Sequence, residues 1–486
     1  MFSSLGIDTP TLILLCLAIL LALSFEFVNG FHDTANAVAT VIYTNTLKPY
    51  QAVIWSGAWN LIGVLLSSGA VAFGIVALLP VELVINVGSG AGFAMVFALL
   101  LSAIIWNLGT WYLGLPASSS HTLIGSIVGV GLMNSLLSPG SAFGDGVNWA
   151  KVADTVKALV FSPLIGFVVA GLLLLAARFL LRIPALYKSP EGKNPPPWWI
   201  RLLLIFTCTG VSFAHGSNDG QKGMGLIMLI LVGTVPISYA LNRAMPADQT
   251  SQFAIVAHAA QSALTATAPG AAPADARATL STYVRTKAVA PDTLPALAAI
   301  AGSIGDQVQQ HDTLAKVPAA AVANVRNDMY LASETIRLVD KDSHVKLDAD
   351  THDKLMVFKK NIDGATKFIP LWVKVAVAIA LGLGTMVGWK RIVVTVGEKI
   401  GKTHLTYAQG MSAELVAMCT IGLADNFGLP VSTTHVLSSG VAGTMAANRS
   451  GLQWSTIRNL AMAWVLTLPA AVLLSGSLYW LFAKVF

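Results

Sequence analysis

Two acidic side chains lie inside apolar stretches of this chain. Asp33 ends the run NGFHD at 29–33, and Asp219 lies within the run HGSNDG at 215–220. A carboxylate at membrane depth is costly and persists only with a cation, a proton or hydrogen bonds to hold it. Because the same residue recurs in two similar runs, we interpret Asp33 and Asp219 as groups that bind a coupling ion. A carboxylate that only joins two helices is the alternative.

The residue three positions after each aspartate lies on the same helical face. It is Asn36 in the first run and Lys222 in the second. An amide oxygen at this spacing can share a cation with the carboxylate. An ammonium there can instead take the place of a mobile sodium ion, so we hypothesise that the half with Lys222 needs no sodium. An ordinary Asp–Lys pair that lowers the cost of burial is the alternative.

Two hydroxyl-rich motifs have the composition of an anion site. GLPASSSHTL at 114–123 returns as GLPVSTTHVL at 428–437. Proline followed by Ser and Thr is typical of a helix start, and the free N–H groups of such a start bind phosphate or sulfate. N-capping alone is the simpler interpretation of one copy, but two copies favour an anion cradle. The predicted substrate-binding residues are Ser118, Ser119, Ser120, His121, Thr122, Ser432, Thr433, Thr434 and His435.

The two histidines that follow the hydroxyls have two open interpretations. His121 and His435 either donate to the anion and carry a proton, or are buried histidines bonded to backbone carbonyls. Around the aspartates, His32, Asn218 and Gln221 are expected to support the coupling-ion groups.

These residues are set in a chain that is too apolar to be soluble. Of its 486 residues, 55% are hydrophobic and 11% are charged, and the mean hydropathy is +0.68. A soluble chain carries about 25% charged residues, so the composition predicts an integral membrane protein in a lipid bilayer. The net charge of +6 comes from short loops between apolar stretches, which indicates membrane orientation and not nucleic-acid binding.

A membrane-spanning helix needs about 20 apolar residues, and ten segments meet this requirement. We predict crossings at residues 11–43, 52–79, 93–113, 120–137, 157–181, 201–241, 369–389, 404–426, 430–447 and 457–483. The first and sixth are too long for one straight helix, and both contain polar, glycine-bearing runs. We therefore expect two broken helices, whose interrupted backbone lines a cavity.

The motifs repeat in the same order in both halves of the chain. Each half has five crossings, with the aspartate run in the first and the hydroxyl motif opening the fourth. An odd number of crossings inverts the second half, so the sequence predicts two inverted-topology repeats with the substrate near the midplane. The first repeat is 11–183, and the second is 197–242 together with 369–483. The fold class is therefore an all-α integral membrane protein of about ten crossings with one soluble helical insert.

The insert at 243–366 holds almost half of the charged side chains. Pro-Gly and Pro-Asp pairs before 295 indicate a flexible stretch. Apolar residues at helical spacing from 296 to 362 indicate two or three soluble helices. Lys and Arg gather in four loops that ten crossings would place together on the cytoplasmic side. The insert and both termini are then expected in the periplasm.

The runs at 29–40 and 215–225 and both Gly-Leu-Pro-x-Ser motifs resemble the PiT family of inorganic phosphate transporters. The resemblance covers about 360 residues outside the insert, and it is closest to the bacterial low-affinity, proton-coupled type. It implies a homodimeric, multi-pass inner-membrane protein with inverted repeats. The implied activity is phosphate import by symport, with the anion carried as a neutral complex with a divalent metal, Mg²⁺ or Ca²⁺, and with no permanently bound cofactor.

Carried over from the family's motifs, Asp33, Asn36 and Asp219 match coupling-ion positions, and 118–122 and 432–435 match phosphate-binding segments. In the sodium-coupled branch both aspartate motifs read Gly-Ala-Asn-Asp-x-x-Asn. Here His32 replaces the first Asn of one motif and Lys222 the last Asn of the other, which puts sodium coupling in doubt.

Other functions remain as alternatives at this stage. A sulfate or other oxyanion transporter, a sodium-coupled phosphate transporter, and a phosphate channel or receptor fit the same residues. A membrane hydrolase fits poorly, because the chain has no Gly-x-Ser-x-Gly elbow or His-Glu-x-x-His pair, and because two inverted copies suit alternating access better than catalysis.

Overall fold

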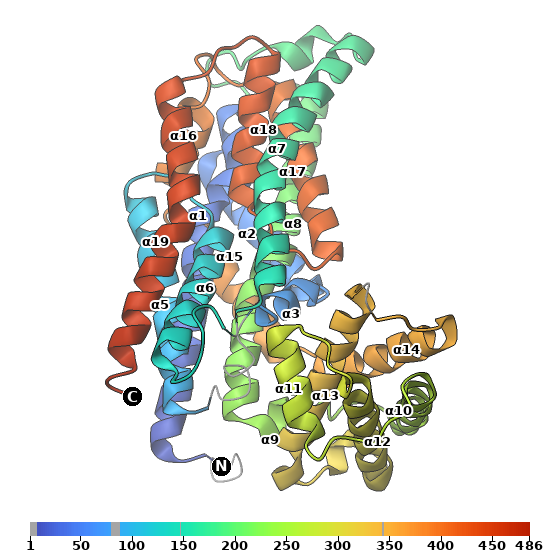
Figure 1. Cartoon of the computed structure of the whole chain (residues 1–486). Coiled ribbons are helices and arrows are strands. Elements are labelled where there is room, and N and C mark those ends of the chain that lie inside the picture. The colour runs from blue at the N-terminus through green and yellow to red at the C-terminus, as the bar shows by residue number, and fades with distance from the viewer. Residues whose placement is uncertain (1–6, 79–87, 146, 343–344) are drawn as a thin grey trace. The chain divides into compact units, whose positions relative to one another are not determined.

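The computed structural model of this chain describes residues 7–78, 88–145, 147–342 and 345–486. The side chains of residues 34–36 and 151 are also outside the description. Apart from one isolated bridge between Gly401 and Leu452, the regular structure of the described residues is helical (Figure 1). The chain divides into two compact units, one built mainly from Met228–Phe368 and one from Cys16–Pro80, Gly90–Ile227 and Ile369–Phe486. The second is the membrane unit.

The helices of the membrane unit, including α1 and α8 that continue beyond it, follow the predicted apolar segments. They are α1 (Thr9–Tyr43), α2 (Pro49–Leu66), α3 (Ala70–Val76), α5 (Gly90–Tyr112), α6 (Ser119–Leu137), α7 (Trp149–Leu180), α8 (Trp198–Thr234), α15 (Leu371–Met386), α16 (Lys390–Glu398), α17 (Tyr407–Asn426), α18 (Thr433–Ala447) and α19 (Trp454–Phe482). Six helices of the described chain are long and apolar enough to cross a membrane, or up to eight if each of two bent pairs forms one span. The ten crossings stay a prediction.

The expectation of two broken helices is wrong, because α1 and α8 run through the polar stretches without interruption. The glycines there permit close packing between helices instead of ending a helix. A Cβ at Gly30 would lie 2.4 Å from the Leu381 carbonyl oxygen, and one at Gly216 would lie 2.1 Å from the Asn60 carbonyl oxygen. The backbone therefore keeps its own hydrogen bonds, and the glycines let neighbouring backbones approach.

A bend is found instead in the second predicted crossing, 52–79. Here α2 and α3 are inclined by 75°. The residue before α3, Gly69, has φ +89°, a conformation that glycine adopts without strain. The polar turn between the two helices is stabilised by Lys374 Nζ, which donates to the Ser67 carbonyl at 2.8 Å.

The packing of the helices has the pattern expected of two related halves. Helix α6 packs along α19, and α18 packs along α7, as Figure 1 shows for the second pair. In the predicted repeat α6 corresponds to α18 and α7 to α19. The contact between α6 and α19 in one half is therefore equivalent to the contact between α18 and α7 in the other. Helices α2 and α15, which also correspond, pack against each other. These pairings support the repeat, whose inverted arrangement stays a proposal.

The insert is more helical than the sequence indicated. The short helix α9 (Pro236–Tyr239) precedes it, and it contains α10 (Ala247–Thr267), α11 (Ala276–Thr286), α12 (Thr293–His311), α13 (Ala319–Lys341) and α14 (Ala349–Thr366). The flexible stretch predicted before 295 therefore holds two helices, α10 and α11. Alanine favours a helix. Phe253 of α10 also packs on Phe358 of α14 with ring centroids 6.1 Å apart, and this tertiary contact stabilises a helix that the Pro and Gly residues in the sequence did not suggest.

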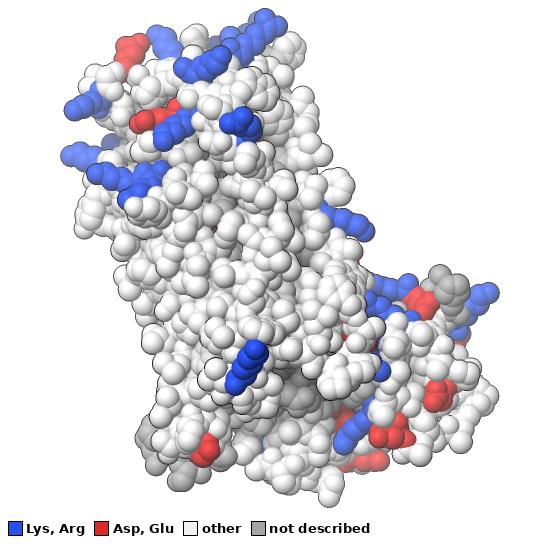
Figure 2. Space-filling model, turned by 60° about the vertical axis from the view of Figure 1, so that its left-hand side comes forward, with Lys and Arg blue, Asp and Glu red and all other residues white. Residues whose placement is uncertain are grey.

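Hydrogen bonds join the loops that carry the basic residues. Asn45 Nδ2 donates to the Gly192 carbonyl, Arg178 donates to Asn448, and the Lys402 N–H donates to the Gly451 carbonyl. These loops therefore lie at one end of the membrane unit. Figure 2 shows Lys and Arg gathered at that end, above a broad band with few charged side chains, a distribution that suits a bilayer with one basic face.

Candidate functional site

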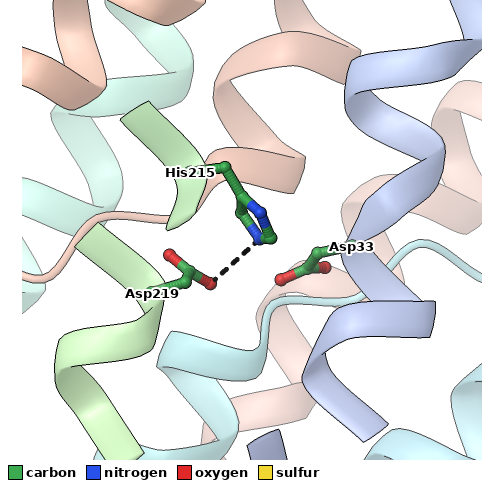
Figure 3. A group of neighbouring side chains, drawn as sticks. All are labelled: Asp33, His215 and Asp219. Carbon is green, nitrogen blue, oxygen red and sulfur yellow. Dashed lines mark ion pairs between the residues drawn. The ribbon is translucent and has the colours of Figure 1, made fainter. Parts of the chain in front are cut away.

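The two aspartates predicted to bind a coupling ion lie together inside the membrane unit. Ligand atoms of Asp33, His215 and Asp219 all fall within 4.8 Å of one another, and the three residues are buried (Figure 3). Asp33 comes from α1, and His215 and Asp219 come from adjacent turns of α8. His215 Nε2 lies 3.5 Å from Asp219 Oδ2.

Asp33 connects both hydroxyl motifs to this centre. Ser119, at the start of α6, donates to Asp33 Oδ2 at 3.2 Å, and Thr434, at the start of α18, donates to Asp33 Oδ1. His32 Nδ1 lies 3.1 Å from the same Oδ1, and its Nε2 lies 3.1 Å from the Thr110 hydroxyl. One carboxylate therefore holds the ends of two helices whose sequence positions are more than 300 residues apart.

Asp219 has a different set of contacts. Lys222 Nζ lies 2.7 Å from Asp219 Oδ2, and both side chains are fully buried. Asp219 Oδ1 accepts no hydrogen bond from the described residues. A buried carboxylate oxygen without a donor is costly, so this atom is available to a cation or a proton.

Several hydroxyls of the two motifs are used by the protein itself. Ser118 and Ser432 are N-caps that accept from the N–H groups of His121 and His435 at 3.2 and 3.1 Å. Gly114 and Gly428, which open the motifs, have φ +67° and +62°, so both copies begin with the same left-handed turn. The capping interpretation therefore holds for the first serine of each motif.

Other members of the motifs tie the helices to their surroundings. Ser120 donates to the Val431 carbonyl at 2.7 Å, and Thr122 donates to Asn107 Oδ1 at 2.9 Å. The hydroxyl of Thr433 is buried and has no hydrogen-bond partner among the described residues. Of the nine predicted substrate-binding residues, Ser119 and Thr434 thus contact the Asp33 carboxylate, and Thr433 has a buried hydroxyl that the described residues leave unpaired.

The two histidines of the motifs contact each other. The ring centroids of His121 and His435 are 4.6 Å apart, and the His435 ring lies 4.3 Å from that of Trp464. Neither His121 Nδ1 nor His435 Nε2 has a hydrogen-bond partner in the described chain. The pair joins the starts of α6 and α18, and its free nitrogens suit a ligand or a proton.

The predicted supporting residues, His32, Asn218 and Gln221, hold the helices of the centre in place. Asn218 Nδ2 donates to the Leu429 carbonyl at 3.1 Å, and Gln221 accepts from the Val71 N–H at 2.9 Å, so both fix α8 against the segments beside it. His32 contacts Asp33 as described above. The side chain of Asn36 lies outside the described residues.

Sequence reasoning missed two buried glutamates. Glu26 of α1 and Glu414 of α17 are both fully buried. Glu414 accepts from Thr40 of α1 and Thr207 of α8, and the Glu26 carboxylate accepts from Asn29 Nδ2 at 3.4 Å. Each glutamate interrupts an apolar run in the sequence, and that same signal led us to Asp33 and Asp219. They lacked only a repeated motif around them.

The arrangement combines two kinds of binding capacity in one place. Paired carboxylates bind a cation, and the starts of two helices with free hydroxyls bind an anion.

Residues 29–475 match the phosphate transporter family. The chain belongs to that family. The resemblance to PiT transporters is thereby confirmed, and the protein is a transporter and not an enzyme.

Close relatives within the phosphate transporter family cover the whole chain. The Escherichia coli low-affinity inorganic phosphate transporters PitA and PitB are 45% and 43% identical to it, each over 98% of both chains. A probable low-affinity inorganic phosphate transporter of Bacillus subtilis is 27% identical over 98% of this chain and 99% of its own. The solved structure of a sodium-dependent phosphate transporter shares the fold, with a TM-score of 0.53 and 19% identity over 98% of this chain and 100% of the other.

Proposed function

We propose that this protein imports inorganic phosphate across the bacterial inner membrane by proton symport, with alternating access to one central site. The observation that carries the proposal is the position of Asp33, which accepts hydrogen bonds from both hydroxyl motifs while lying beside Asp219 and His215. An anion bound at the two helix starts would therefore share its site with the coupling groups, and this proximity is what couples their movement.

Phosphate binds in this proposal at the starts of α6 and α18. Their partial positive charge and free donors stabilise an anion, and Thr433 offers a hydroxyl without another partner. Hydrogen phosphate also donates a hydrogen bond, which sulfate does not. The Asp33 carboxylate beside the hydroxyls can accept it, so the site favours phosphate over the sulfate alternative.

The negative charges need compensation before the site can close. A divalent cation, Mg²⁺ or Ca²⁺, travelling with phosphate as part of the substrate would be held between Asp33 and Asp219, whose oxygens are the ligands that these ions prefer. A proton taken up at the same centre removes a further negative charge. Sodium is the weaker candidate, because the Lys222 ammonium already occupies one side of Asp219.

The proposal extends to the protein's surroundings. From the basic loops at one end of the membrane unit we infer that this end faces the cytoplasm, and we propose that the insert and both termini are in the periplasm. Two inverted repeats then move against each other to open the site to either side. A homodimer is proposed from the family resemblance.

Uptake of labelled phosphate into vesicles tests the coupling. The pH and sodium gradients are imposed separately, each with and without Mg²⁺. We expect accumulation to follow an inward proton gradient, to require Mg²⁺ and to collapse with a protonophore. Uptake that depends on sodium and ignores the protonophore would refute proton coupling, and a tenfold excess of sulfate that abolishes uptake would favour the oxyanion alternative. Counterflow of labelled against unlabelled phosphate distinguishes a carrier from a channel.

A further inference from the structure

Glu26 is a buried carboxyl group of α1 for which the proposed function has no use. The residue lies on the same face of α1 as Asp33, seven positions earlier, with Asn29 between them. It is fully buried. The centre therefore contains three carboxylates, Glu26, Asp33 and Asp219, and one fixed cation, Lys222. A buried charge of this kind needs a partner.

Among the described residues, Asn29 is the one side chain that donates a hydrogen bond to Glu26. Asn29 donates to Glu26 Oε2 at 3.4 Å, while Glu26 Oε1 accepts no hydrogen bond from the described residues. The side-chain amide oxygen of Asn29, Oδ1, is likewise buried and accepts no hydrogen bond from the described residues. Two acceptor atoms one turn apart thus lie ready for a group that carries donors or positive charge.

A buried cation, Lys222, is next in sequence to the residue of α8 that Glu26 contacts. Glu26 lies against Gly223, the residue after Lys222: a Cβ at Gly223 would come within 2.3 Å of Glu26 Cγ and 2.6 Å of Oε1. Only glycine leaves room for the carboxylate at this point of α8. Lys222 carries three N–H donors on a flexible four-carbon stem, and its 2.7 Å ion pair with Asp219 lacks hydrogen-bond alignment.

We propose that Glu26 is the second anionic partner of Lys222. When the cation that accompanies phosphate binds Asp219, the Lys222 ammonium leaves Asp219 and pairs with Glu26 and Asn29. The exchange keeps the ammonium neutralised in both states and frees the Asp219 oxygen that it had covered. This inference rests on the proposed function, and it makes Glu26 a positioning residue that acts through Lys222.

The consequence is a specific energetic coupling between two residues. Without Glu26, Lys222 has no second partner and stays on Asp219, so the substrate cation binds poorly. Without Lys222, the substrate cation can bind Asp219 directly, and there is no ammonium for Glu26 to bind. The loss of Glu26 should therefore matter only while Lys222 is present, which a double-mutant cycle measures directly.

The test compares Glu26→Gln, Lys222→Met and the double variant in proteoliposomes, with initial uptake of labelled phosphate at a fixed Mg²⁺ concentration. We expect Glu26→Gln to lower the rate at least tenfold in the wild-type background and by less than twofold in the Lys222→Met background. Glu414→Gln is the matched control, because it also removes a buried glutamate charge but has Thr40 and Thr207 as partners. Its cost should be the same in both backgrounds.

Thermal unfolding of the detergent-purified protein gives a second readout. Mg²⁺ with phosphate should raise the unfolding temperature of the wild type and of Glu26→Asp, which keeps the charge, but not that of Glu26→Gln. An equal loss of rate from Glu26→Gln in both backgrounds, or a full ligand-induced shift in Glu26→Gln, would overturn the inference. A wild type that takes up no phosphate would count against the proposed function instead.

Discussion

Asp33 and Asp219 show how two copies of one residue acquire different surroundings. Asp33 is held by hydroxyls from two helices and by His32, whereas Asp219 is held by an ammonium on its own helix and by His215. The first is oriented mainly by hydroxyl donors and the second by the ammonium of Lys222. A site of this kind can change its net charge at Asp219 without releasing the helices that Asp33 joins.

Thr433 provides a test of the anion site at the scale of one hydroxyl. Because this buried hydroxyl has no partner in the described chain, Thr433→Val removes nothing that the protein itself uses. A hydrogen bond to a charged ligand is worth about 1.5–3 kcal/mol, so we expect the half-saturating phosphate concentration to rise roughly tenfold or more. Uptake kinetics at fixed pH and Mg²⁺ measure it.

Thr444→Val is the matched control for this prediction. Thr444 lies on the same helix and donates to the Val441 carbonyl at 2.8 Å, away from the helix start. Its replacement should leave the half-saturating phosphate concentration within about twofold of the wild type. Equal changes in the two variants would contradict a role for Thr433 in binding phosphate.

At the scale of elements, the glycines of α8 decide how closely helices approach. Gly216 faces the Asn60 backbone without room for a Cβ, whereas Gly422 of α17 has nothing within 4 Å of its ideal Cβ. Gly216→Ala is expected to destabilise the protein by about 1–3 kcal/mol through overpacking. Gly422→Ala should be neutral or stabilising by up to about 1 kcal/mol, because alanine favours a helix.

Thermal or denaturant unfolding in detergent measures both glycine variants. A Gly216→Ala protein as stable as Gly422→Ala would show that α8 and α2 are not in close backbone contact. Retained phosphate uptake in Gly422→Ala confirms that the control variant is folded.

The junction between α13 and α14 in the insert is expected to respond to pH. His352 of α14 lies 2.8 Å from Asp340 of α13, and hydrogen bonds to Asp340 and Asp353 raise the pKa of His352 above its ordinary value. The stabilisation from this raised pKa is fully present below the ordinary histidine pKa. It is lost as the pH rises through the raised value.

Hydrogen exchange of the full-length protein checks this sign. Protection of α13 and α14, corrected for the intrinsic pH dependence of exchange, should be greater at pH 5.5 than at pH 8.5 in the wild type. His352→Gln should show no such difference. Greater protection at pH 8.5 in the wild type would contradict the assignment.

At the scale of the whole molecule, the distribution of charge predicts the orientation in the membrane. Exposed basic residues lie near one another: Arg178 in the last turn of α7, and Lys193, Lys402 and Arg449 in loops. Loops rich in Lys and Arg stay in the cytoplasm. With the native cysteines replaced, a cysteine at Asn194 should react with an impermeant maleimide only after the cells are opened. A cysteine at Ser251 in the insert should react in intact cells, and the reverse pattern would invert the proposed orientation.

The amino-acid sequence alone determined the membrane class, the helix positions, the two repeated motifs and the family resemblance. These features depend on local composition and spacing, which are the same whatever the tertiary structure. Asp33, Asp219 and the hydroxyl motifs were found because a buried charge and a repeated helix start are costly or unusual in apolar sequence. The predicted breaks in α1 and α8 failed because a glycine that ends a helix and one that lets helices pack closely look alike in sequence.

Only the tertiary structure decided which of these residues meet. It placed Ser119 and Thr434 on one carboxylate, assigned Ser118 and Ser432 to capping, and brought Glu26 against Gly223 of α8. Contacts of this kind depend on how helices distant in sequence pack, and the energy of a hydroxyl or a carboxylate depends on its neighbours and not on its position in the chain. The sequence therefore supplies the chemical groups, and the packing of α1, α6, α8 and α18 determines which of them form the site.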